Sequence, residues 1–255
     1  MLLEAWQYLR YKSNLPYVKK MGYLTEAIAM QQRAKRCRLQ WGAHYQHCQR
    51  VIKTFCEQQD SHRTLLVLGA GSTQDLPLEY LSRRYQNIHL VDVVFLNSVR
   101  HRVEFLNNVH LVEHDVSESL SNVFQQKPKI LPPVYFLNDA EVDAVISVNI
   151  VTQLPLLPLK WLQKQTSQLD DEQALAFAQN LIQLHLEYLK KFPKALLIAD
   201  QEGIGYQDDK EIERFDPWWD LPPVAVDEDW FWELIPDGEV KRGFRQVHRV
   251  GVTEL

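Results

Sequence analysis

The sequence is poor in cysteine and has no apolar run long enough to cross a membrane. Its 255 residues include three cysteines, Cys37, Cys48 and Cys56, within one short region. An odd number of cysteines without paired spacing predicts no disulfide framework, so we expect reduced thiols and a cytoplasmic location. A membrane-spanning helix needs about 20 apolar residues in succession, and their absence predicts that no segment spans a membrane. The start of the chain also lacks the apolar run and cleavage site of a signal peptide.

A paired metal-binding motif is missing as well. His44, His47, Cys48 and Cys56 lie close together in the sequence, but no C-x-x-C pair accompanies them. Structural zinc sites usually draw on such closely spaced pairs. We therefore expect these side chains to divide between the core and the surface of a helix, and we predict no metal site.

No large excess of basic charge marks the chain as a whole. The formal net charge is −5, which predicts no binding to nucleic acid through the bulk surface. Hydrophobic residues make up 45% and charged residues 24%, as in ordinary globular domains. A chain of this length can form one large domain with an appendage.

Residues 10–53 depart from this balance, because they hold ten lysines and arginines and a single acid, Glu26. Apolar residues recur there at helical spacing, which predicts an N-terminal helical cap over residues 1–60 and an α/β domain over 61–255. The basic side chains could steer an anionic substrate. A solvated helix face packed on an acidic body is the alternative, and we favour it.

Residues 64–92 predict a β-loop-α-β unit. Leu65–Leu68 form an unbroken apolar run, typical of a strand buried on both faces of a parallel sheet. Gly69-Ala70-Gly71 then turns the chain, and a second apolar strand ends at Asp92. A glycine turn followed by an acid about 20 residues later is the arrangement that holds a nucleoside, with the carboxylate on the ribose hydroxyls. An ordinary αβ unit with a tight turn remains the alternative.

The third glycine of the dinucleotide fingerprint is absent, because Gln74 occupies its position. That glycine allows close helix–strand packing around a pyrophosphate. A Walker A lysine is missing too. A nucleoside that carries an amino-acid end therefore suits this loop better than a dinucleotide.

These features resemble the class I, Rossmann-like S-adenosylmethionine-dependent methyltransferases. Three later segments are similar to the third, fourth and fifth strands of that family, and a turn at Pro236–Glu239 separates two final strands that would form its terminal antiparallel pair. The similar segments are residues 109–115, 142–149 and 195–200. One departure is Val67, where the family often has an acid.

The resemblance implies an α/β fold with a Rossmann-like, seven-stranded, mostly parallel sheet. Its C-terminal strand would be antiparallel, with helices on both faces and an N-terminal helical cap. It implies S-adenosyl-L-methionine as cofactor and methyl transfer to an unidentified acceptor, a small molecule by preference and a protein as the other possibility. The cofactor site would comprise Gly69, Ala70, Gly71, Ser72, Asp75, Asp92, Val93, His114, Asp115, Ser147 and Asn149.

Substrate contacts are predicted less sharply than cofactor contacts. His44, Asn149 and Tyr206 are candidates for substrate contact or proton removal. The family commonly places N-terminal helices over the substrate pocket, so the polar-aromatic residues 36–45 are expected to form a substrate wall or to serve a structural role. Asp115 could bind adenine or cap the helix that follows it. Residues 200–228, rich in glycine and proline, predict an irregular loop over the substrate.

Two other function classes stay open. A non-catalytic relative could keep the fold as a binding or assembly module, and Val67 is consistent with that. An NAD(P)-dependent oxidoreductase is the second, although Gln74 and the predicted terminal hairpin count against it.

Overall fold

A computed structural model describes residues 2–127, 129–164 and 169–255. In this part of the chain, one mixed sheet has the strand order β3-β2-β1-β4-β5-β8-β7, with β6 paired to the outer part of β5. The strands are β1 (Thr64–Leu68), β2 (Asn87–Asp92), β3 (Val109–Glu113), β4 (Val142–Val148), β5 (Ala195–Gln207), β6 (Lys210–Phe215), β7 (Glu228–Ile235) and β8 (Phe244–Glu254).

The neighbouring strands from β3 to β5 are parallel, and β8 runs antiparallel between β5 and β7. This arrangement confirms the predicted fold, including the terminal antiparallel pair. Over the described residues the sheet has eight strands where seven were expected, because β6 was not predicted.

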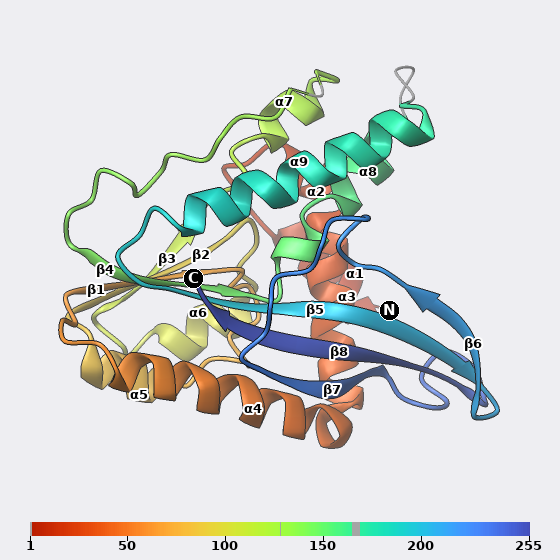
Figure 1. Ribbon diagram of the computed structural model, residues 1–255, viewed down its shortest axis with the longest axis horizontal. Helices are drawn as coiled ribbons and strands as arrows, with labels where there is room; N and C mark the ends of the chain where they lie inside the picture. The colour runs from red at the N-terminus through yellow and green to blue at the C-terminus, as the bar shows by residue number, and fades with distance from the viewer. Residues whose placement is uncertain (1, 128, 165–168) are drawn as a thin grey trace.

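Helices cover both faces of the sheet (Figure 1). Leu65 and Val67 of β1 belong to the core cluster that includes the fourth N-terminal helix, whereas Leu66 and Leu68 belong to the cluster on the opposite face. All are buried, as the unbroken apolar run requires. The helices are α1 (Leu2–Arg10), α2 (Tyr17–Lys20), α3 (Tyr23–Arg36), α4 (Arg38–Glu57), α5 (Leu78–Arg84), α6 (Asn97–Val103), α7 (Leu120–Phe124), the 3-10 turn η1 (Val151–Gln153), α8 (Leu156–Leu162) and α9 (Asp171–Leu189).

Helices α1 to α4 occupy the residues that were assigned to the cap, and the proposed boundary falls between α4 and β1. Figure 1 shows α4 running beneath the C-terminal strands. Arg36 donates to Glu239 at 3.1 Å, and Arg50 pairs with Glu228. These two basic side chains of the N-terminal helices thus pair with acids of β7 and of the turn that follows it.

The prediction of an irregular loop over residues 200–228 was wrong in its first half. Strand β5 continues to Gln207 and forms a hairpin with β6. Gly203 lies opposite Phe215, and a Cβ atom there would come within 1.9 Å of the phenyl ring. The glycine therefore marks a close approach of a neighbouring side chain to the backbone within a strand, not a break in it.

Within the described residues, no helix combines the length and the apolar character that a membrane crossing requires.

Candidate functional site

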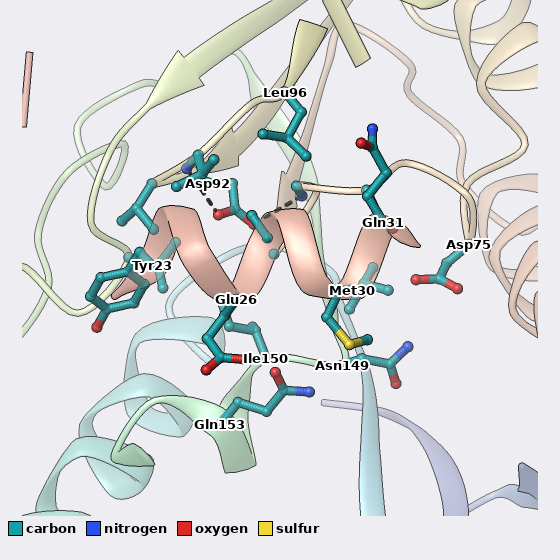
Figure 2. A pocket seen from close by; sticks show the side chains of 18 of the residues that line it. Tyr23, Glu26, Met30, Gln31, Asp75, Asp92, Leu96, Asn149, Ile150 and Gln153 are labelled. Carbon is teal, nitrogen blue, oxygen red and sulfur yellow. Dashed lines mark hydrogen bonds between the residues drawn. The ribbon is translucent and has the colours of Figure 1, made fainter. Parts of the chain in front are cut away.

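A cavity of about 560 Å³ lies at the carboxyl ends of the parallel strands, beside α3 (Figure 2). Gly69 directly follows β1, Asp92 ends β2, and Asn149 directly follows β4. The strand order reverses between β1 and β4, and ligands of open α/β sheets bind at such a switch point. The predicted residues that line the cavity are Gly69, Gly71, Ser72, Asp75, Asp92, Val93, His114, Asp115 and Asn149.

Four predicted residues do not line it. Ala70 is buried in the core, and Tyr206 lies on the β5 extension, where its ring contacts Arg245 at 4.0 Å. Ser147 is fully buried, with its hydroxyl 2.9 Å from His185 Nε2 on α9. Alternation along β4 explains this placement, because successive side chains face opposite sides of the sheet. His44 lies behind the cavity wall.

The glycine turn is built around the end of β2. Gly69 has φ of +80°, and its N–H donates to the carbonyl of Val91 at 3.0 Å. Gly71 N–H donates to Asp92 Oδ2 at 2.9 Å, and Val94 N–H donates to Oδ1 at 3.3 Å, as the dashed lines in Figure 2 mark. A Cβ on Gly71 would approach Asp92 Oδ2 to 2.7 Å. A glycine is therefore needed for this contact between loop and carboxylate.

Asp92 is poised to accept further hydrogen bonds. Burial raises its pKa to about 6, while the hydrogen bonds from backbone N–H groups act in the opposite direction. An ionised carboxylate offers about four lone-pair sites, so two backbone donors leave capacity for the hydroxyls of a ligand.

Asp115 accepts hydrogen bonds from the turn ahead of α7, although the N-cap residue of that helix is Ser119 and not Asp115. Its Oδ1 accepts from the backbone and the hydroxyl of Ser117 at 2.9 and 2.7 Å, and its Oδ2 accepts from Leu120 N–H at the start of α7. Burial raises the pKa of this carboxyl. The side chain also reaches the cavity, so the predicted contact with adenine stays a prediction.

Helix α3 supplies a cavity wall that sequence reasoning missed. Tyr23, Ala27, Met30 and Ala34 all line the cavity and recur at the spacing i, i+4, i+7, i+11. That spacing places the four side chains on one face of the helix, and it is the sequence signal from which this wall could have been predicted. Burial and the nearby Asp115 carboxylate raise the pKa of Tyr23 well above its usual value, so the phenol stays protonated.

The end of the cavity opposite Tyr23 holds Asp75, which Figure 2 shows far from Tyr23 across α3. Trp41, Tyr45 and Trp232 line the cavity there with Asn149. Of the polar-aromatic residues 36–45, therefore, two aromatic side chains reach the wall. Asn149 has φ of +49°, a left-handed conformation that asparagine tolerates better than most residues.

Trp230 fixes the tautomer of His44. The Trp230 indole N–H lies 3.1 Å from His44 Nδ1, and indole is a donor only. We therefore assign the proton of the neutral imidazole to Nε2, which lies 3.5 Å from Asp75 Oδ1. The ring is also stacked on Trp232 at 3.9 Å.

His44, Cys48 and Asp75 bring three possible metal ligands together, but their chemistry opposes metal binding. A metal at His44 Nε2 would move the proton to Nδ1, where it would face the indole N–H. Burial, with Asp75 nearby, raises the pKa of the Cys48 thiol, whereas a metal needs the thiolate. We interpret this cluster as part of the cavity wall.

Carboxylates dominate the charged groups around the cavity. Glu26, Asp75, Asp92 and Asp115 line it. Lys160 also lines it, and its Nζ lies 3.8 Å from Glu26 Oε1. The balance of charge favours a ligand with cationic groups.

No protein-family model matches the chain, and no curated protein shows significant sequence similarity to it. Solved structures with a similar arrangement include the DhpI-SAM-HEP complex, at 11% identity over 94% of this chain and 84% of that one, with a TM-score of 0.43. Another is a 1,6-didemethyltoxoflavin-N1-methyltransferase of Burkholderia thailandensis with S-adenosylhomocysteine bound, at 13% identity, 90% and 89% coverage and a TM-score of 0.37. A third is the glycopeptide N-methyltransferase MtfA with S-adenosylmethionine, at 13% identity, 78% and 75% coverage and a TM-score of 0.36. These likenesses are distant, and none of them identifies a substrate for this chain.

Proposed function

We propose that this protein binds S-adenosyl-L-methionine in the cavity and transfers its methyl group to a small-molecule acceptor. One observation carries the proposal. Asp92 is hydrogen-bonded to the glycine turn at the edge of the cavity, where its carboxylate accepts from Gly71 N–H at 2.9 Å. Such an acid, about 20 residues after the turn, suits the two hydroxyls of a ribose. The excess of carboxylates around the cavity suits a cofactor with a sulfonium and an ammonium group.

Bound S-adenosylmethionine supplies an already activated methyl group. The chain itself then has to hold the ribose at Asp92, let the ligand approach the glycine turn, and exclude water with helices α1 to α4. His44 is a poor general base, because its Nδ1 faces the Trp230 indole N–H at 3.1 Å and its Nε2 carries the proton. Tyr206 lies outside the cavity lining, and the Asn149 amide does not titrate. We therefore assign the role of general base to none of these three residues.

Titration calorimetry separates the three function classes. We expect S-adenosylmethionine and S-adenosylhomocysteine to bind and NAD to give no heat. Binding of NAD alone would instead support an oxidoreductase. Silence with all three ligands would support a non-catalytic module and would remove the proposed function.

The pH dependence of binding tests the role of Asp92. The apo carboxyl has its pKa raised to about 6 by burial, and ribose hydroxyls donate to the ionised form. Affinity for S-adenosylhomocysteine should therefore be full above that pKa and fall as the pH drops through it, by up to about tenfold per pH unit. The measurement is the Kd of S-adenosylhomocysteine from about pH 5 to about pH 8, a range that spans the raised pKa of Asp92. Asp92→Asn should flatten the profile, and a flat profile in the unaltered protein would contradict the assignment.

A further inference from the structure

Three aromatic rings form a corner at the Asp75 end of the cavity. The Trp41 and Trp232 rings are 5.1 Å apart and inclined at 75°. The Trp41 and Tyr45 rings are 6.1 Å apart and inclined at 82°. All three residues line the cavity, together with Asp75. The π-faces of aromatic rings attract a cationic nitrogen, and a carboxylate beside them adds the attraction of a negative charge.

One carboxylate oxygen at this end is not reached by any hydrogen bond from the described part of the protein. Asp75 Oδ1 is buried, and among the described residues it accepts no hydrogen bond. His44 Nε2 lies 3.5 Å from Asp75 Oδ1. Buried acceptors are normally satisfied, so a missing donor points to a ligand that brings N–H groups. A protonated amine has N–H groups and positive charge together.

On the basis of the proposed function, we propose that the methyl acceptor is an amine and that its nitrogen binds between Asp75 and the rings of Trp41, Tyr45 and Trp232. The amine binds as an ammonium beside the Asp75 carboxylate and loses a proton to solvent before it reacts. The freed nitrogen lone pair then forms the bond to the methyl carbon. The carbon–sulfur bond breaks as that bond forms, its electron pair stays on sulfur, and the nitrogen takes up the positive charge.

His44 is a positioning residue in this arrangement. Trp230 holds the Nε2 proton of His44 toward Asp75, and stacking keeps the imidazole parallel to the Trp232 ring. The imidazole N–H attracts the Asp75 carboxylate across 3.5 Å without a hydrogen bond to Oδ1, so this oxygen can still accept from a ligand.

The test compares two probes of the same shape, choline and 3,3-dimethyl-1-butanol, which differ in the positive charge. Choline stands in for a methylated ammonium product. Each is titrated by calorimetry into the full chain, with and without saturating S-adenosylhomocysteine. We expect choline to bind at least about tenfold more tightly than the neutral alcohol, the margin that aromatic faces provide at a desolvated site.

Asp75→Asn should weaken choline binding by about tenfold, because it removes a charge beside the ligand. Since Asp75 is assigned here to the acceptor, and not to the cofactor contact that the resemblance implies, Asp75→Asn should change the Kd of S-adenosylhomocysteine less than that of choline. Asp60→Asn is the matched control, since Asp60 is exposed and does not line the cavity, and it should change neither value. Tyr45→Leu should also weaken choline binding, whereas Tyr45→Phe keeps the ring and should retain it.

Three results would overturn the inference while leaving the proposed function in place. One is equal affinity for choline and the alcohol, or no binding of either, in a protein that binds S-adenosylhomocysteine. The second is a larger effect of Asp75→Asn on S-adenosylhomocysteine than on choline, which would assign Asp75 to the ammonium group of the cofactor. The third is retained choline affinity in both Asp75→Asn and Tyr45→Leu. Failure of the unaltered protein to bind S-adenosylhomocysteine would instead reject the proposed function, whatever choline does.

Discussion

Asp92→Ala is expected to weaken binding of S-adenosylhomocysteine by about 1–3 kcal/mol, or roughly 5- to 150-fold in Kd. The alanine removes the acceptor for the ribose hydroxyls and also releases Gly71 N–H, which the carboxylate holds at 2.9 Å. Both the contact and the shape of the turn are lost. Titration calorimetry of the two proteins at pH 7.5 (about 1.5 units above the raised pKa) measures the effect.

The variant should still fold, which makes the comparison meaningful. The pKa of Asp92 is raised to about 6, so the folded protein favours the protonated carboxyl. Any stability from that preference is present at low pH and is lost as the pH rises through the raised pKa. At pH 7.5, removing the ionised group therefore relieves a burial penalty that partly offsets the lost backbone hydrogen bonds. Unchanged affinity in a folded Asp92→Ala protein would remove Asp92 from the site.

Gly69→Ala is expected to lower the free energy of unfolding by about 3 kcal/mol. Gly69 has φ of +80°, and a Cβ there would lie 2.6 Å from the backbone carbonyl oxygen of Val148 and 2.9 Å from Ile150 Cβ. The backbone strain and the collision both act at the point where β1 and β4 meet the cavity. Chemical denaturation of the two proteins measures the loss.

Gly238→Ala is the matched control. Gly238 has nearly the same φ, +82°, but a Cβ there meets nothing within 4 Å. The Gly238→Ala variant should therefore be destabilised only by the strain of the left-handed conformation, by about 1–2 kcal/mol. An equal loss of stability in the two variants would mean that the close packing of the turn against β4 does not contribute to the free energy of unfolding.

The parts of the fold that the sequence predicted are those encoded by neighbouring residues. An apolar run, a glycine turn and an acid at a strand end lie within residues 64–92, and the strands and turn appear where expected. The start of α9 shows the same kind of local signal, because Asp170 makes a capping box with Gln173. Local chemistry of this kind does not depend on where distant segments pack.

The parts that were missed depend on contacts between distant residues. Trp230 sets the tautomer of His44 from 186 positions away, and no local pattern records that pairing. Gly203 resembled a loop residue because Phe215, which packs over it, belongs to a strand that was not foreseen. Ser147 was assigned to the cofactor from its place at the end of β4, but the alternation of the strand turns it toward His185.

A crystal structure with S-adenosylhomocysteine bound tests the central claim most directly. We predict that both ribose hydroxyls lie within hydrogen-bonding distance of the Asp92 carboxylate and that the thioether sulfur faces the end of the cavity formed by Asp75, Asn149 and the aromatic rings. A ligand bound elsewhere on the chain, or a bound ligand whose ribose makes no contact with Asp92, would contradict the account.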